Sequence, residues 1–115
     1  MVTMHWSDAA IELIAHRFKL LSGTSRLRLV FALYDGEKSV SELMEITHME
    51  QANVSRQLSL LIDGGLIMRH KTQQKVWYSL ADETLIELTG LVFRSLFQRS
   101  TDVLASFSSE DTSRG

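Results

Sequence analysis

Apolar residues recur at three- and four-residue steps along the first third of the chain, which is the period of an amphipathic helix. Over residues 7–21, where Ser7 is a predicted N-cap, the apolar stripe consists of Ala10, Leu13, Ile14, Phe18 and Leu21. A second helix is predicted from a cap at Thr24 or Ser25 to the pair at 35–36, with a shared face of Leu27, Val30, Phe31 and Tyr34. Both helices are predicted to form scaffold.

The next segment predicts a short helix, a turn and a longer helix, which is a helix-turn-helix arrangement. The short helix begins at Ser39 and carries apolar residues at Val40, Leu43, Met44 and Ile46. The turn covers residues 47–49, and the longer helix runs from about residue 50 to residue 63. Its positions i, i+4 and i+7, which are expected to face the core, are Val54, Leu58 and Leu61. The positions expected to point away are Ala52, Asn53, Arg56 and Ser59.

A change in pattern follows the longer helix, because two glycines at 64–65 are a strong helix stop. Residues 66–71 and 75–80 are rich in β-branched, aromatic and aliphatic residues, which predicts a β-hairpin. The polar residues 72–74 lie between these two strands. We therefore expect a hairpin with a polar, cationic tip.

Helical spacing returns from residue 82 to about residue 107, at Leu85, Leu88, Val92, Leu96, Val103, Leu104 and Phe107. Further apolar residues on this segment exceed what one small domain can cover, so a second chain is the expected partner. The predicted fold is mainly α with a β-hairpin wing (α+β). Its order is four helices, two strands and a helix, and it dimerises through the first and last helices. Residues 1–107 are predicted to form one domain, and residues 108–115 a disordered tail.

Charge is distributed unevenly along this chain of 115 residues, which has a net charge of −2 and a pI near 6.0. Bulk positive charge is absent, so any nucleic-acid binding must come from a local patch. Residues 51–75 carry four cations against one carboxylate, a local charge of +3. The chain has no cysteine, which excludes disulfides and thiolate metal sites. With no signal-like N-terminus and no run of ~18 apolar residues, we expect a cytoplasmic protein without a membrane partner.

Five stretches of the sequence resemble the signature segments of the ArsR family. They are residues 25–30 (SRLRLV), 40–43 (VSEL), 51–61 (QANVSRQLSLL), and 65–67 (GLI) followed by 76–80 (VWYSL). The resemblance implies a winged helix-turn-helix transcription regulator that binds double-stranded DNA as a homodimer. It is expected to be a repressor that recognises an inverted repeat. No cofactor is expected.

The helix over residues 50–63 is the expected reading helix, because an α-helix fits the major groove. The amides of Gln51 and Asn53 suit adenine, whereas Arg56 suits guanine or a phosphate. Cations at the hairpin tip are expected to add affinity, although the tip also fits the solvated end of an ordinary hairpin. The expected DNA-contacting residues are Gln51, Ala52, Asn53, Ser55, Arg56, Arg69, Lys71, Gln74 and Lys75.

Two residues at the start of the reading helix depart from the family pattern, which often has a glycine in the turn and a serine as the cap. This chain has His48 and Glu50 at these places. Histidine tolerates a positive φ better than bulkier residues do, and a carboxylate suits the N-terminus of a helix. The same carboxylate repels phosphate, so Glu50 is expected to favour specificity over affinity.

The metal sites of the family are incomplete in this sequence. The stretch that matches the cysteine-bearing segment reads EKSVSEL over residues 37–43, and hydroxyls do not replace thiolates for soft metals. The other common site of the family places aspartate and histidine on the last helix. Asp102 and the acidic pair at 110–111 match the acidic part, but no histidine follows His70. His70 itself is expected to be a wing residue. A further candidate set, which also fits the polar face of a helix, is His5, Asp8, Glu12 and His16. No metal is therefore predicted.

Regulation is predicted either by a small apolar effector held between the first and last helices or by protein level alone. The candidate pocket residues, which core or dimer packing also explains, are Met4, Trp6, Phe93 and Phe97. The sequence has no glycine-rich phosphate loop and no plausible catalytic triad, so an enzyme is not expected. The alternative function is a winged-helix module that binds proteins without binding DNA.

Overall fold

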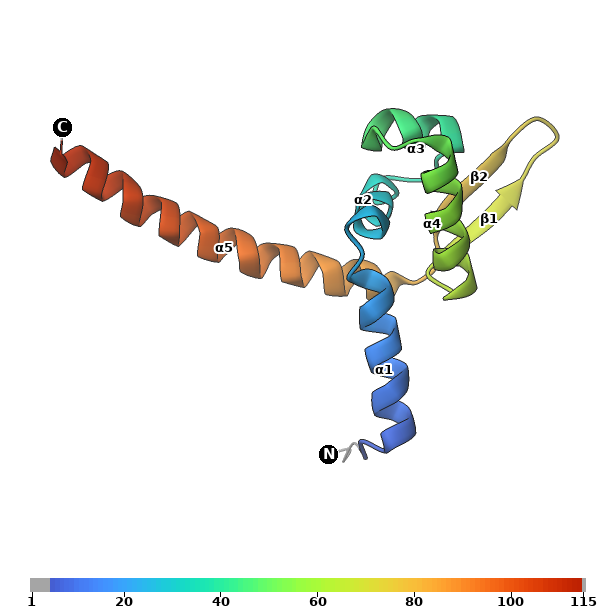
Figure 1. The fold of residues 1–115 in the computed structure, drawn as a ribbon, viewed down its shortest axis with the longest axis horizontal. Helices are drawn as coiled ribbons and strands as arrows, with labels where there is room; N and C mark the ends of the chain where they lie inside the picture. The colour runs from blue at the N-terminus through green and yellow to red at the C-terminus, as the bar shows by residue number, and fades with distance from the viewer. Residues whose placement is uncertain (1–4, 115) are drawn as a thin grey trace. The chain divides into compact units, whose positions relative to one another are not determined.

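The computed structural model describes residues 5–114, and its side chains are described for residues 5–99. The chain divides into two compact units whose boundary falls between Asp82 and Glu83. The elements are α1 (Asp8–Leu21), α2 (Thr24–Ala32), α3 (Val40–Thr47), α4 (Gln51–Asp63), β1 (Ile67–Lys71), β2 (Val76–Leu80) and α5 (Glu83–Arg114) (Figure 1). This is the predicted order of four helices, two strands and a helix.

The first two helices begin and end for identifiable reasons. Ser7 caps α1 as predicted, because its hydroxyl accepts a hydrogen bond from the amide of Ala10 at 3.1 Å. The predicted cap of α2 is wrong: Gly23 is the N-cap, and it offers no side-chain bond. α2 also ends at Ala32, before the predicted stop, because the following residues form a hydrogen-bonded turn.

The core of the first unit lies where α2, α3 and α4 meet. Its fully buried side chains are Leu29, Val30, Leu43, Val54, Leu58, Leu61 and Leu66. The predicted buried face of α4 is therefore confirmed. The face predicted for α2 is confirmed only at Val30, since Phe31 and Tyr34 are exposed and Leu29 is buried in their place.

The two strands form an antiparallel hairpin in which Ile67 pairs with Leu80 and Lys71 pairs with Val76. Its tip closes through the amide of Thr72, which donates to the carbonyl oxygen of Lys75 at 2.8 Å. The predicted strands are confirmed to within one residue at each end. The hairpin projects away from the helices of the first unit (Figure 1).

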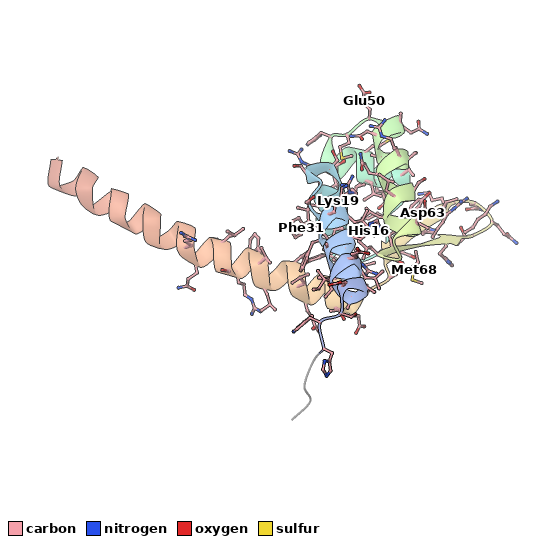
Figure 2. All side chains as sticks on the ribbon, turned by 60° about the horizontal axis from the view of Figure 1, so that its bottom comes forward. His16, Lys19, Phe31, Glu50, Asp63 and Met68 are labelled. Atoms are coloured by element: carbon pink, nitrogen blue, oxygen red, sulfur yellow. The ribbon has the colours of Figure 1, made fainter. Side chains whose placement is uncertain are left out.

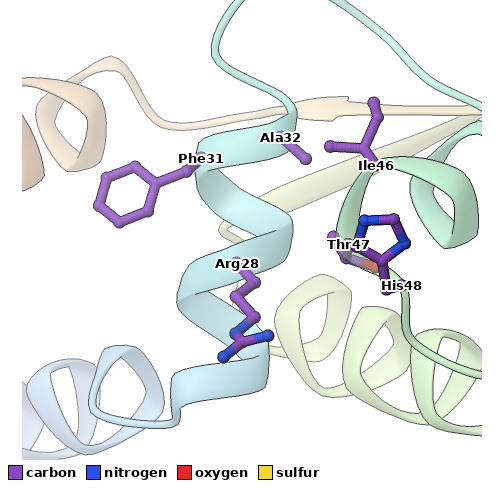
Figure 3. A pocket seen from close by; sticks show the side chains of 6 residues that line it. All are labelled: Arg28, Phe31, Ala32, Ile46, Thr47 and His48. Carbon is purple, nitrogen blue, oxygen red and sulfur yellow. The ribbon is translucent and has the colours of Figure 1, made fainter.

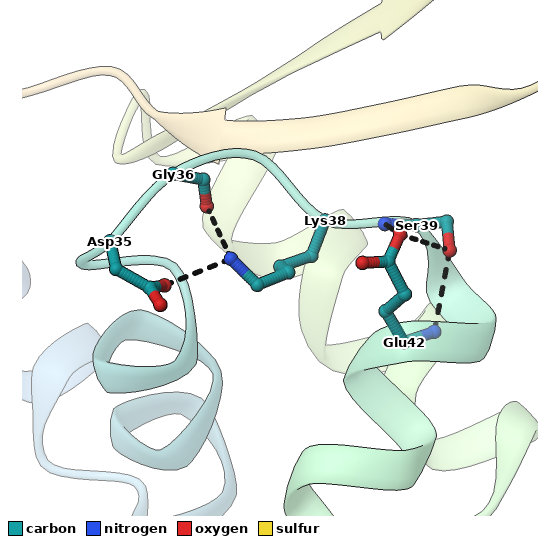
Figure 4. A network of polar contacts seen from close by, with 5 residues as sticks. All are labelled: Asp35, Gly36, Lys38, Ser39 and Glu42. Carbon is teal, nitrogen blue, oxygen red and sulfur yellow. Dashed lines mark hydrogen bonds and ion pairs between the residues drawn. The ribbon is translucent and has the colours of Figure 1, made fainter.

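Lys38 ties the base of the hairpin to the segment before α3. Its backbone exchanges two hydrogen bonds with Tyr78, at 3.0 and 2.8 Å. Its side chain is only 15% exposed, and the ammonium group donates to the Asp35 carboxylate at 2.8 Å and to the Gly36 carbonyl at 3.2 Å (Figure 4). Lys38 therefore attaches the hairpin to the helical part of the first unit, in addition to the hydrogen bonds between β1 and β2.

The helix α5 forms the second unit and runs to Arg114, beyond the end predicted near Phe107. The prediction of one domain over residues 1–107 with a disordered tail stays a prediction. Among the side chains of α5 described up to residue 99, the apolar ones that are at least half exposed are Leu91, Val92, Phe93, Leu96 and Phe97. No described helix combines the length and the apolar content that crossing a membrane requires.

Candidate nucleic-acid interface

The turn between α3 and α4 is held by its own residues. His48 is the C-cap of α3 and adopts the left-handed conformation with φ of 60°, which confirms the tolerance expected of this residue. The buried hydroxyl of Thr47 donates to the carbonyl oxygen of Leu43 at 2.6 Å and accepts from the amide of Met49 at 3.3 Å. These bonds fix the angle at which α4 leaves α3.

The first turn of α4 has no side-chain cap. Glu50 is its N-cap residue, yet the carboxylate accepts no hydrogen bond from the helix and points outward into solvent (Figure 2). The first amide groups of an α-helix have no partner within the helix. The start of α4 therefore presents unsatisfied donors next to one exposed negative charge.

Most of the residues predicted to contact DNA from α4 are exposed, namely Gln51, Ala52, Ser55 and Arg56. Asn53 differs, because it is half-buried and its side-chain oxygen is already engaged. This oxygen accepts from the guanidinium of Arg56 at 3.0 Å and from the amide of Gln57 at 3.1 Å. The outward face of α4 is thus as predicted, except that Asn53 faces its own helix.

The hairpin exposes the polar residues that the sequence predicted there, which are Arg69, Lys71, Gln74 and Lys75. Among the side chains described, none of these cations, and not Arg56 either, is paired with a carboxylate. The ammonium of Lys75 lies 5.2 Å from the centre of the Trp77 ring, which is a cation–π contact. His70 is exposed on the same hairpin, as expected of a wing residue.

The candidate metal ligands at His5, Asp8, Glu12 and His16 do not assemble into a site. Across the described side chains, no three histidine, aspartate or glutamate residues lie close enough together to hold a metal ion. His5 precedes α1, which begins at Asp8, so the helical spacing that would bring it toward Glu12 and His16 does not apply. Ser39, in the segment that resembles the cysteine-bearing segment of the ArsR family, caps α3.

A pocket of about 420 Å³ lies between α2 and the end of α3. Its lining residues are Arg28, Phe31, Ala32, Ile46, Thr47 and His48 (Figure 3). None of the residues predicted for an apolar effector lines it. Trp6, Phe93 and Phe97 are all more than half exposed, and Met4 lies outside the described residues. The structure gives the predicted effector pocket no support.

Two residues that sequence reasoning did not single out, Arg26 and Gln57, hold Asn53 in place on α4. Arg26 of α2 donates through Nη1 to the side-chain oxygen of Gln57 at 2.9 Å, and Gln57 in turn donates to Asn53. A charged residue in the apolar segment of α2 was the available signal for Arg26. The spacing of four residues between Asn53 and Gln57 was the signal for the pair on α4.

Comparison with known proteins places these features in a family. A family model described as bacterial regulatory protein, arsR family, matches residues 24–68. The chain is 30% identical over 80 residues to the biofilm growth-associated repressor of Xylella fastidiosa, and the match covers 70% of each protein. The matched family segment includes α2, the whole helix-turn-helix and the start of the wing.

Solved structures share the fold. Rv0081 from Mycobacterium tuberculosis superposes with a TM-score of 0.75 at 27% identity, covering 85% of this chain and 99% of that one. The homodimeric winged helix-turn-helix DNA-binding domain of Mb0332 from Mycobacterium bovis gives a TM-score of 0.73 at 26% identity, over 84% and 93% of the two chains. The helices and hairpin described above therefore form a winged helix-turn-helix.

Proposed function

The chain belongs to the ArsR family of bacterial regulatory proteins, and on that basis we propose that it represses transcription by binding an inverted-repeat operator as a homodimer. One observation carries the proposal. The exposed face of α4 begins without a side-chain cap and is accompanied by hairpin cations that have no carboxylate partner among the described residues. Such a surface offers base-reading groups on a helix and phosphate-binding groups on a wing.

The second copy of the chain is the proposed cover for two apolar helix faces. On α1, the side chains of Ile11, Leu13 and Phe18 are 49%, 72% and 53% exposed. The exposed apolar residues of α5 given above form a second such face. Contiguous apolar surface of this kind marks an interaction site, and the structurally similar Mb0332 domain is homodimeric. Pairing through α1 and α5 would bury both faces.

The dimer supplies the geometry that an operator requires. Two reading helices about 34–36 Å apart reach successive major grooves on one face of DNA, so each half-site is read once. Gln51 and Arg56 are the proposed base-contacting side chains, and Arg69, Lys71 and Lys75 are the proposed phosphate-contacting ones. A dimer bound at a promoter blocks polymerase without a separate activation surface. The proposed location of this repressor is the cytoplasm.

Thiolate metal sensing is not part of the proposal, because the chain contains no cysteine. The residues in the corresponding segment are serines, and Ser39 is occupied as the cap of α3. Regulation of this protein is therefore proposed to use a signal other than a thiolate-bound metal, or to act through the cellular concentration of the protein.

The test is selection of operator DNA by the purified full chain from fragmented genomic DNA, followed by fluorescence anisotropy across a salt series. We expect an imperfect palindrome bound by a dimer. Arg56→Ala should weaken binding to that site by about fivefold or more, whereas Ser59→Ala, an exposed change on the same helix, should leave it unchanged. Lys75→Ala should weaken all sequences alike and reduce the salt slope by about one.

The rival function is a winged-helix module that binds proteins and not DNA. It predicts that no sequence is enriched and that DNA binding disappears by physiological salt. In that outcome the repressor proposal is wrong. Enrichment of a palindrome that Arg56→Ala no longer prefers excludes the rival.

A further inference from the structure

A continuous chain of hydrogen bonds joins the end of α1 to the exposed face of α4. The Nε of Arg26 donates to the carbonyl oxygen of Leu20 at 2.6 Å, and its Nη1 donates to Gln57 at 2.9 Å. Gln57 donates to Asn53 at 3.1 Å, and Arg56 donates to the same Asn53 oxygen at 3.0 Å. Three helices thereby contribute to the position of a single exposed guanidinium.

Arg26, the first residue in this series of hydrogen bonds, is held by close packing as well as by hydrogen bonding. Its half-buried guanidinium lies against Gly23, where an added Cβ would sit 2.5 Å from Cζ. The carbonyl of Leu20 belongs to the last turn of α1, so it has no partner within that helix and accepts this bond instead. A charge-assisted bond to an otherwise unsatisfied carbonyl holds Arg26 in one orientation.

The side-chain oxygen of Asn53 has no acceptor capacity left. A carbonyl oxygen offers two lone pairs, and those of Asn53 are used by Arg56 and Gln57. Reading adenine with asparagine requires that this oxygen accept from the N6 amino group while the amide nitrogen donates to N7. Asn53 meets this requirement only if at least one of the two internal bonds breaks.

Arg56 keeps its DNA-binding capacity in the same arrangement. One of its five N–H donors is directed to Asn53, which leaves four donors on an exposed residue. Two of these are sufficient for a bidentate contact with O6 and N7 of guanine. Orientation by Asn53 reduces the number of rotamers that Arg56 must give up on binding.

We propose that Asn53 is a positioning residue rather than a base reader, and that it orients Arg56 toward a guanine of each operator half-site. Gln57 and Arg26 hold Asn53 in place from within the fold. This inference rests on the proposed repressor function, since it concerns how the same helix recognises the operator. The recognition of one guanine in each half-site thus depends on two residues, Arg56 and Asn53.

The test compares operator selection by the wild type, Asn53→Ala, Arg56→Ala and the double variant, with Ser59→Ala as the control. We expect both single variants to lose preference at the same guanine, by about fivefold to 150-fold for Arg56→Ala and by less for Asn53→Ala. The double variant should discriminate no worse than Arg56→Ala alone, because the two residues act through one contact. If Asn53→Ala instead relaxes a separate adenine and the losses multiply, the positioning role is wrong.

Asn53→Asp provides a second readout that does not depend on truncation. Aspartate keeps the acceptor oxygens for Arg56 and Gln57 but loses the donor, and its charge weakens binding to all sequences. Selection should therefore retain the guanine. A direct reader would instead shift its preference from adenine toward cytosine, whose N4 amino group donates to a carboxylate. That shift would overturn the inference.

Two controls separate the possible failures. Thermal unfolding and sedimentation of each variant show whether it remains a folded dimer, and Asn53→Asp replaces Asn53→Ala if the latter unfolds. A wild-type protein that enriches no sequence contradicts the repressor function, and the inference falls with it. An enriched palindrome in which Asn53 and Arg56 govern different bases contradicts only the inference.

Discussion

The two helices of the helix-turn-helix begin in different ways. At the start of α3, the Ser39 hydroxyl accepts from the amide of Glu42 at 3.3 Å, and the Glu42 carboxylate accepts from the amide of Ser39 at 3.3 Å. At the start of α4, Glu50 makes no such bond. The start of α3 is closed by a capping box, whereas the first turn of α4, the proposed reading helix, has no side-chain cap.

The buried faces of the same two helices do not differ. Leu43 of α3 is fully buried, and Leu58 of α4 is 1% exposed. The contrast between α3 and α4 is therefore confined to their N-terminal ends, where Ser39 is buried and Glu50 is exposed. Packing therefore positions both helices in the same way. The polar groups at their N-termini make the difference, because, of the two, only α4 begins with amide groups that no side chain caps.

The largest expected effect tests the equality of the buried faces. Leu43→Ala and Leu58→Ala should each lower the free energy of unfolding by about 2–5 kcal/mol, because each removes buried methyl groups and leaves a cavity. Urea unfolding followed by circular dichroism measures both. Leu60→Ala is the control on α4, since this side chain is 43% exposed and should cost much less. A loss at Leu60 equal to that at Leu58 would contradict the assigned core.

The next effect tests the cap of α3. Ser39→Ala should lower the free energy of unfolding by about 1 kcal/mol, because the amide of Glu42 loses its partner. Operator affinity of the folded protein should stay the same, since this cap lies outside the proposed interface. Ser41→Ala is the matched control, because Ser41 is exposed on the first turns of the same helix. The contrast between the two helices fails if Ser39→Ala weakens DNA binding while stability is unchanged.

A smaller effect is expected when a cap is added to α4. Glu50→Ser should raise the free energy of unfolding by a few tenths of a kcal/mol, because the gain of a cap exceeds the loss of a favourable charge at the helix start. Glu50→Gln, which removes the charge without adding a preferred cap, should not be more stable than the parent. Both variants should bind all DNA sequences more tightly, by about two- to fivefold at low salt. Unchanged affinity in both would show that the carboxylate lies away from phosphate.

The smallest effect concerns the ion pair that precedes α3. The hydrogen bond from Lys38, together with its positive charge, lowers the pKa of the exposed Asp35 carboxyl. A carboxyl whose pKa is lower in the folded state adds stability above its unfolded pKa, and this contribution is lost as the pH falls through the folded value. Asp35→Asn should therefore be slightly less stable at pH 7 and match the parent at pH 2. The neighbouring change Glu37→Gln should show no such dependence if the ion pair is the cause.

Most of the fold followed from the sequence because local patterns determine it. Helical spacing identified Val54, Leu58 and Leu61 as buried, and the glycine pair located the end of α4. Strand composition located the hairpin to within a residue. These features depend on residues close in sequence, so periodicity and turn chemistry are sufficient to find them.

The features that the sequence did not predict depend on residues far apart or on side-chain rotamers. The bond between Arg26 and Gln57 joins positions 31 residues apart, which no local pattern reveals. Asn53 was expected to face DNA because amides suit adenine, but its rotamer turns the oxygen toward Arg56 and Gln57. The apolar stripe of α1 located the helix, yet only Leu21 of that stripe is buried within the single chain.

The contact between Lys75 and Trp77 gives the wing a built-in optical reporter. The ammonium lies 5.2 Å from the centre of the indole ring, at the tip where phosphates are expected to arrive. When the ammonium leaves the ring for a phosphate, the electrostatic environment of the indole changes, and its emission changes with it. Trp6, the other tryptophan, precedes α1 and lies outside the wing. A Trp6→Phe protein would therefore carry a single tryptophan, Trp77 on the wing, and selective excitation of it would make the arrival of DNA there observable in real time without an attached dye.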